Sequence, residues 1–187
     1  MNEEKIIGER RDSVHATYEM YERFNGQQYG RKYQLSPCGL TQTAEIDIKY
    51  LRPGMKPIGY AGDNDDSDWI DLRAGEDIDL EPFQRCAIPL GVAMALPIGY
   101  EAKIEARSST YSNFKIIRIN SGVIDGRYCG PDDEWHFEAL ALEKTHIPKN
   151  ARICQFRIYM TQPKITFREV DDLKGTNRGG YGTTGVD

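Results

Sequence analysis

The strongest constraint on the fold is a series of short segments, from Ala44 onward, in which apolar and polar residues alternate. The pattern recurs in EIDIKYL, QRCAIPLGVAMALP, YEAKIEARS, WHFEALALE, ARICQFRIY and ITFREV. Successive side chains of a strand point to opposite faces, so a period of two predicts half-buried strands. Glycine, proline and aspartate separate the segments. Several short strands at this spacing favour an all-β barrel or jelly roll over an α/β fold.

The first 43 residues have a different character, because they are polar and rich in tyrosine. Val14, Tyr18 and Tyr21 recur at i, i+4 and i+7 after Ser13, and an Asn-Gly pair follows at 25–26. That spacing predicts a short amphipathic helix, followed by irregular chain. We interpret residues 1–43 as an N-terminal extension that packs at the periphery; a functional element is the alternative.

The end of the chain is rich in glycine and threonine, and these residues cannot build a core strand unaided. We expect residues 177–187 to form a flexible arm suited to wrapping a ligand. The sequence therefore divides into an extension (1–43), a β domain (44–176) and an arm (177–187).

Composition excludes several classes of function. The net charge of −5 argues against a broad nucleic-acid surface. No apolar run approaches the roughly 20 residues of a membrane-spanning helix, and the charged N-terminus does not resemble a signal peptide. The four cysteines and three histidines lack metal-ligand spacing, so we expect reduced thiols and no zinc site. We expect a cytoplasmic protein without nucleic-acid or membrane partners.

ARSST, at residues 106–110, is the first segment whose residue types indicate chemistry. Arg107 offers two parallel N–H donors, and Ser108 and Ser109 add hydroxyl donors after a predicted strand. Phosphate oxygens suit this combination. An ordinary loop is the alternative for this segment taken alone.

NSGVIDGRYCG, at residues 120–130, predicts a hairpin bounded by Gly122 and Gly126. It carries Asp125 near its turn and Tyr128 three residues later. A carboxylate held there is suited to activating water, and the exposed main chain to reading the edge of a small ring. The alternative is an Asp-Gly turn that only closes a hairpin.

RGGYGTTG, at residues 178–185, combines glycines that let main-chain N–H groups approach an anion with threonine hydroxyls and Arg178. Tyr181, among these glycines, is placed to lie over a bound base. A tail without a binding role is the alternative.

Five segments occur in a fixed order: DWIDLRA (68–74), ARSST (106–110), NSGVIDGRYCG (120–130), ARICQFRI (151–158) and RGGYGTTG (178–185). This order resembles the five motifs of the trimeric dUTPase family, over residues 44–187, and is most similar to the Gram-positive bacterial and phage branch. The resemblance implies a jelly-roll-like β-barrel (the β-clip fold) and a homotrimer with shared active sites. It implies magnesium-dependent hydrolysis of dUTP to dUMP and pyrophosphate.

The resemblance also implies roles for individual residues. Arg107, Ser108 and Ser109 contact phosphate. Asp71 acts on Mg²⁺ through metal-bound water, which suits a cation that retains waters, and Gln155 contacts phosphate or metal-bound water. Asp125 is the implied catalytic residue, which activates the attacking water, and Tyr128 packs on deoxyribose and excludes a 2′-hydroxyl. The remaining substrate-binding positions are Asn120, Gly122, Val123 and Ile124 in the hairpin, and Arg178, Tyr181, Thr183 and Thr184 in the arm.

The chain departs from the family pattern at three places. The arm is shorter than usual and has Tyr181 in place of phenylalanine. Asn120 lies five residues before Asp125, where six is commoner. PDDE (131–134) lengthens the hairpin, and we considered Trp135 and Phe137 after it as substitute aromatic cover; alternating strand packing is the other interpretation.

Two other functions remain open from the sequence. A dCTP deaminase, alone or bifunctional with dUTPase activity, would use Glu138 as its catalytic glutamate, although Ser112 stands where that pattern has a second arginine. A regulatory protein on the dUTPase scaffold would act by protein–protein binding, with the N-terminal extension as the possible partner surface.

Overall fold

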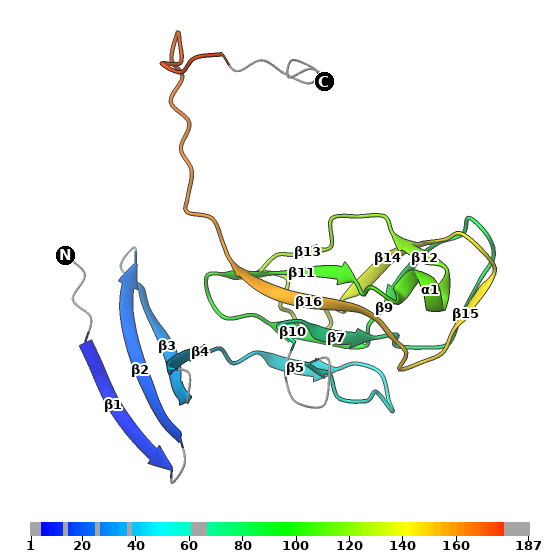
Figure 1. Ribbon diagram of the computed structural model, residues 1–187, viewed down its shortest axis with the longest axis horizontal. Coiled ribbons are helices and arrows are strands. Elements are labelled where there is room, and N and C mark those ends of the chain that lie inside the picture. The colour runs from blue at the N-terminus through cyan, green and yellow to red at the C-terminus, as the bar shows by residue number, and fades with distance from the viewer. Residues whose placement is uncertain (1–4, 13–14, 25–26, 37–38, 61–66, 178–187) are drawn as a thin grey trace, which may run out of the picture.

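Nearly all regular structure in the chain is β-strand (Figure 1). The computed structural model describes residues 5–12, 15–24, 27–36, 39–60 and 67–177. The elements from residue 47 onward are β5 (Asp47–Tyr50), β6 (Gly59–Tyr60), β7 (Ile70–Arg73), β8 (Ile78–Leu80), β9 (Arg85–Pro89), β10 (Val92–Ala95), β11 (Tyr100–Ala106), α1 (Thr110–Phe114), β12 (Ile116–Arg118), β13 (Val123–Ile124), β14 (His136–Ala141), β15 (Thr145–Ile147) and β16 (Arg152–Met160). The all-β prediction is confirmed. Within the described residues, no helix has the length and apolar character needed to cross a membrane.

The strands of the β domain pair antiparallel in four sheets. The largest has the order β13-β11-β16-β7-β6, and a second has the order β12-β14-β9. The two-stranded sheets are β10-β5 and β15-β8. Neighbours in the largest sheet are distant in sequence, since β16 pairs with β7 on one side and with β11 on the other. The central strand β16 therefore ties together the motifs that the sequence analysis identified.

The core lies between these sheets, where the alternating strands direct their apolar side chains inward. Trp135 and Phe137 are almost fully buried, and the Trp135 ring meets Phe156 edge to face, with centroids 5.2 Å apart. Such edge-to-face contacts add to the burial of apolar area. These two residues are core residues, so the suggestion that they cover the site is wrong: the period of two on β14 directs both inward.

The N-terminal extension forms a sheet instead of the predicted helix. Its strands are β1 (Lys5–Asp12), β2 (His15–Phe24), β3 (Gln27–Ser36) and β4 (Gly39–Thr43), paired antiparallel in chain order. The register pairs Phe24 with Gln27, so two residues separate β2 from β3. In sequence those residues are Asn-Gly, the pair typical of two-residue hairpins. Pairing between strands therefore outweighs the helical spacing; Val14 and 25–26 lie outside the described residues.

Residues 161–177 leave the β domain after β16 and extend away from it (Figure 1). They contain no strand or helix, so the expectation of a strand in ITFREV is wrong for the single chain. A strand needs a partner to satisfy its main-chain groups; the Thr161 N–H donates to the Gly99 carbonyl at 2.8 Å, but within the described residues no strand pairs with this segment. Four of its apolar side chains are exposed: Ile165, Phe167, Val170 and Leu173.

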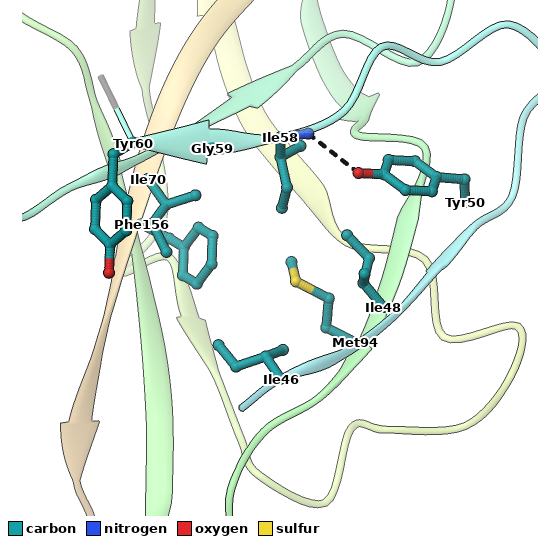
Figure 2. A pocket seen from close by; sticks show the side chains of 9 residues that line it. All are labelled: Ile46, Ile48, Tyr50, Ile58, Gly59, Tyr60, Ile70, Met94 and Phe156. Carbon is teal, nitrogen blue, oxygen red and sulfur yellow. Dashed lines mark hydrogen bonds between the residues drawn. The ribbon is translucent and has the colours of Figure 1, made fainter. Parts of the chain in front are cut away.

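A second apolar surface is an open pocket of about 190 Å³ between β5, β10 and the β6–β7 pair (Figure 2). Ile48, Met94, Ile70 and Phe156 point into it, and the Ile58 N–H donates to Tyr50 Oη at 3.1 Å on its rim. The single chain thus presents apolar surface both on the extended segment and on the domain itself.

Candidate active site

The Arg-Ser-Ser segment forms a tight turn where β11 ends. The Thr110 hydroxyl accepts from the Arg107 main-chain N–H and donates to the Ile153 carbonyl, each at 2.8 Å. Thr110 is buried, and its N–H donates to the Arg107 carbonyl at 3.0 Å. A hydroxyl three residues after Arg107 thus fixes the turn to β16. The sequence analysis did not single out Thr110, although local side-chain-to-main-chain bonds are common for threonine in turns.

Asp71 holds the Arg107 side chain in place. Asp71 lies on β7, is 3% exposed, and faces Gln155 across the β7–β16 pair. Its Oδ1 lies 2.7 Å from Arg107 Nε, and its Oδ2 accepts from Arg152 Nη1 at 3.1 Å. One buried carboxylate therefore aligns two arginines, which reduces the entropy lost when they bind an anion.

Arg152 is a member of this cluster that sequence reasoning missed. In a regular strand Arg152 and Gln155 would lie on opposite faces, because they are three residues apart. The register of β16 shifts between Arg152 and Cys154, as in a β-bulge. One extra residue reverses the alternation, so Arg152 reaches Asp71 on the side of Gln155. No pattern in the sequence indicates this bulge.

The other predicted phosphate-contacting residues gather around the same arginine. Arg107 Nη1 lies 3.4 Å from the Ser109 hydroxyl and 3.3 Å from the Arg152 carbonyl. Ser108 is exposed beside them, and Gln155 Nε2 donates to the Ala106 carbonyl at 3.4 Å. The structure thus brings five of the predicted residues into one group, which we call the anion cluster: Asp71, Arg107, Ser108, Ser109 and Gln155, with Arg152 added.

Residues 120–130, predicted as a hairpin, contain a single short strand, β13, which pairs with β11. Within the described residues no two strands of this segment pair with each other, so a regular hairpin is not formed; the name hairpin is kept for residues 120–130. Val123 pairs with Lys103, and the Ile104 N–H donates to the Gly122 carbonyl at 2.7 Å. Gly122 has φ +67°, and a Cβ there would lie 2.2 Å from the Ile104 carbonyl oxygen, so only glycine fits. Asn120 Oδ1 accepts from the Gly122 N–H at 3.1 Å. Asn120 therefore stabilises the hairpin whatever its contact with a ligand.

Asp125 and Tyr128 occupy the turn that follows. Asp125 is exposed, its Oδ1 accepts from the Arg127 N–H at 2.7 Å, and its carbonyl accepts from the Tyr128 N–H at 2.9 Å. These bonds fix the carboxylate while leaving it open to solvent. The Tyr128 hydroxyl donates to the Glu134 carbonyl at 3.0 Å.

The anion cluster and the hairpin occupy different parts of the surface of one chain. Within the described residues, no hydrogen bond or ion pair joins Asp125 or Tyr128 to Asp71 or Arg107. The predicted arm residues Arg178, Tyr181, Thr183 and Thr184 lie outside the described residues. The structure therefore assembles the second and fourth motifs with Asp71, and separately the third motif.

Glu138 lies on the sheet β12-β14-β9, where it pairs with Ala87, and not on the sheet that carries the hairpin. It is half-buried. Burial raises the pKa of the Cys86 thiol, and the negative charge of Glu138 adds to that increase. Cys86 pairs with Ala139, so alternation along the strands places Glu138 on the opposite face of the sheet from that thiol. Within the described residues no group of potential metal ligands lies near Glu138.

The described cysteines, Cys86, Cys129 and Cys154, are free thiols, as expected for them; Cys38 lies outside the described residues. Cys154 is fully buried behind the anion cluster. Burial raises the pKa of its thiol well above the ordinary value, and the charge of Asp71 contributes. This thiol is a core side chain and is not suited to nucleophilic chemistry.

Fold and site together define an all-β protein with an anion cluster at a strand end and a glycine-bounded hairpin. A family model described as dUTPase matches residues 68–185. A prophage-derived deoxyuridine 5'-triphosphate nucleotidohydrolase of Bacillus subtilis (strain 168) is 49% identical over 143 residues, which cover 76% of this chain and 99% of that protein. The chain therefore belongs to the dUTPase family, and the predicted membership is confirmed.

Other relatives agree with this assignment. A deoxyuridine 5'-triphosphate nucleotidohydrolase of Finegoldia magna is 39% identical over 138 residues, covering 71% of this chain and 90% of that protein. Among solved structures, the dUTPase of Staphylococcus bacteriophage 80alpha with dUPNHPP superposes with a TM-score of 0.63 at 20% identity, covering 77% of this chain and all of that one. That likeness supports the predicted jelly-roll-type fold.

Proposed function

We propose that the chain hydrolyses dUTP to dUMP and pyrophosphate with magnesium. The observation that carries the proposal is the buried carboxylate of Asp71, which aligns Arg107 and Arg152 beside Ser109. Two aligned guanidinium groups with adjacent hydroxyl donors suit the charge of a triphosphate. The relatives named above carry the same activity in their names.

Asp125 is the proposed general base. One of its oxygens is engaged by the Arg127 N–H, and the carboxylate is exposed where water reaches it. It accepts a proton from water while the water oxygen bonds to the α-phosphorus. The bond from that phosphorus to the oxygen bridging to the β-phosphate breaks, so pyrophosphate leaves. A positioned base of this kind contributes about 10²- to 10⁴-fold to the rate.

The hairpin is the proposed reader of base and sugar. Main-chain groups between Gly122 and Ile124 that are not engaged with β11 are suited to uracil's edge, and a mismatched edge would leave buried groups unpaired. The Tyr128 ring is proposed to pack on deoxyribose and to leave no room for a 2′-hydroxyl. These contacts would select dUTP over dCTP and UTP.

The residues present fit magnesium in a limited way. Asp71 Oδ1 is buried, and within the described residues no donor forms an aligned hydrogen bond to it, although Arg107 Nε lies 2.7 Å away. Water does not reach this buried oxygen in the single chain, so Asp71 is proposed to act on metal-bound water only in the substrate-bound site, as is the Gln155 amide. No group of three potential ligands occurs in the described chain, so the triphosphate would supply most of the coordination. Bound magnesium would neutralise charge on the phosphates.

A homotrimer with shared sites is also proposed. The exposed side chains of residues 165–173 and the pocket lined by Ile46 and Ile48 are apolar surfaces of the kind that association buries. The separation of the anion cluster from the hairpin in one chain is consistent with a site completed by another copy. The arm positions Arg178, Tyr181, Thr183 and Thr184 are proposed to close over the γ-phosphate.

The test is incubation of the purified protein with dUTP, dCTP, dTTP and UTP, with and without magnesium, with products separated by ion exchange. Magnesium-dependent dUMP and pyrophosphate from dUTP alone supports the proposal. Deamination of dCTP would instead indicate a deaminase with Glu138 as its catalytic residue. Asp125→Asn should lose hydrolysis by about 10²- to 10⁴-fold while keeping dUMP binding. Asp132→Asn, an exposed carboxylate in the next loop, is the matched control.

A further inference from the structure

Tyr128 has one side-chain hydrogen bond, and it goes to the lengthened loop. Its hydroxyl donates to the Glu134 carbonyl at 3.0 Å, and the side chain is otherwise 40% exposed. Burial raises the pKa of this phenol, and the charges of Asp133 and Glu134 raise it further. The hydroxyl is therefore a donor throughout the neutral range, and the orientation of the ring depends on where the Glu134 carbonyl lies.

The peptide unit between Glu134 and Trp135 connects Tyr128 to the β domain. The Trp135 N–H donates to the Val92 carbonyl at 2.9 Å. In a trans peptide the N–H and C=O point in opposite directions, so this bond turns the Glu134 carbonyl outward. Trp135 itself is fully buried, which anchors one end of the unit.

The side chain of Glu134 anchors the other end. Its carboxylate accepts from Arg52 Nε at 2.7 Å and from Arg52 Nη2 at 3.0 Å, and it also accepts from the Gly91 N–H at 2.9 Å. Arg52 Nη1 donates to Glu76 at 2.6 Å, so the guanidinium is held on both sides. Bidentate Arg–carboxylate pairs fix geometry as well as adding energy.

Arg52 reaches Glu134 by passing over Gly75. A Cβ at Gly75 would lie 2.7 Å from Arg52 Cδ and 3.0 Å from two main-chain atoms of the following strands. Because Gly75 has no side chain, the space beside it is open to the methylene groups of Arg52. The Glu134 side chain is only 16% exposed, so this ion pair is shielded compared with an ordinary surface pair.

We propose that Glu134, held by Arg52, is a positioning residue that fixes the Tyr128 ring and thereby sets the discrimination between deoxyribose and ribose. This inference rests on the proposed function, in which the ring excludes a 2′-hydroxyl. Exclusion of one oxygen atom requires the ring to stay within a fraction of an ångström, about 0.5 Å. A half-exposed ring attached to a surface turn has no other side-chain bond in the described chain to hold it there.

The experiment compares Glu134→Ala, Tyr128→Phe and the double variant, with kcat/KM measured for dUTP and for UTP. Loss of one hydrogen bond that fixes the ring should shift the dUTP-to-UTP ratio by about fivefold to tenfold toward UTP in each single variant. The double variant should shift no further than Tyr128→Phe, because Glu134→Ala displaces the carbonyl that accepts from the Tyr128 hydroxyl and therefore acts only through that hydrogen bond. Glu134→Gln keeps an oxygen that accepts from the Gly91 N–H, so this variant should retain most of the discrimination between dUTP and UTP.

Asp132→Ala is the control, since Asp132 lies in the same loop as Glu134 but its carboxylate contacts only exposed Lys49 on β5 within the described residues. An equal fall for both substrates in Glu134→Ala, with a lower melting temperature, would mean a purely structural role and overturn the inference. An additive double variant would also overturn it. Binding of dUDP and UDP by calorimetry repeats the comparison without turnover. Failure of the wild-type protein to hydrolyse dUTP would refute the proposed function, and this outcome is distinct from those that overturn the role of Glu134.

Discussion

Asp71 and Arg107 lie on opposite sides of strand β16, yet Oδ1 of the first is 2.7 Å from Nε of the second. Asp71 extends from β7 and Arg107 follows β11, so their contact spans the middle strand of the largest sheet. The acid expected from sequence to act on metal-bound water therefore has a second role, because it sets the direction of the arginine that we propose contacts the phosphates.

Asp71→Asn should lower both stability and activity. The amide keeps the size but removes the charge that aligns Arg107 and Arg152, and its NH₂ group would face cationic donors. We expect a loss of about 1–3 kcal/mol in the free energy of unfolding and a fall of about 10²-fold in kcat/KM for dUTP. Urea denaturation and steady-state kinetics measure the two effects.

Asp68→Asn is the matched control for that variant. Asp68 also pairs with an arginine, Arg157, at 3.1 Å, but its side chain is 81% exposed. Exposed pairs contribute about 0–1 kcal/mol, so stability should be nearly unchanged. Equal losses in both variants would contradict the role given to Asp71.

Gly122→Ala should lower the free energy of unfolding by more than the backbone strain of a positive φ alone would. Gly54 has φ +71° with open space around its Cβ position, whereas a Cβ at Gly122, at φ +67°, meets the Ile104 carbonyl. Gly54→Ala should cost about 1–2 kcal/mol from backbone strain. Gly122→Ala should cost clearly more, since the β11–β13 pair must separate. Thermal unfolding of both variants checks this, and equal costs would refute the close approach.

The Arg52–Glu134 pair should stabilise the protein less in acid. Burial alone would raise the pKa of Glu134, but the hydrogen bonds and charge of Arg52, with the Gly91 N–H, outweigh it and lower that pKa. A folded-state pKa below the unfolded value gives stability that is present above the ordinary value of 4.5 and is lost as pH falls below it. Urea denaturation of wild type and Glu134→Gln should differ most near neutral pH, and the difference should shrink toward pH ~3. A constant difference would contradict the assignment.

Native cysteine labelling should separate Cys129 from Cys154. Cys129 is exposed in the loop after Tyr128, whereas Cys154 is buried and the pKa of its thiol is raised. Iodoacetamide at about pH 8 should modify Cys129 within minutes and Cys154 only after unfolding, since the thiolate is the reactive form. Peptide mass spectrometry distinguishes the sites. Labelling of Cys154 in the folded protein would show that the β7–β16 pair opens readily.

The sequence predicted what depends on local pattern. The period of two predicted the strands that carry Ile104, Phe137 and Phe156, and the glycines beside Asp125 predicted the turn at 125–128, although a regular hairpin is not formed. Both features follow from alternation and turn chemistry within a few residues. Family resemblance supplied the order of the motifs and so every member of the anion cluster except Arg152.

What the sequence did not predict depends on partners distant along the chain. Arg152 joins Asp71 only because β16 shifts register, and the side chain of Glu134 is held only because Arg52 reaches it from the loop after β5. The N-terminal error has a different origin, since the partners of β2 are its neighbours in sequence: the spacing of Tyr18 and Tyr21 fits a helix, but pairing with β1 and β3 determined the outcome.

The two parts of the β-structure differ in when they can fold. Each hairpin of β1–β4 closes between neighbouring segments, so this sheet has low contact order and can form as soon as residue 43 leaves the ribosome. Asp71 and Arg152 are 81 residues apart in sequence, and β7 must wait unpaired on one edge until β16 is synthesised. During translation the anion cluster is therefore among the last features to form. A nascent chain that ends before β16 exposes the unpaired edge of β7, which is prone to aggregation unless a chaperone covers it.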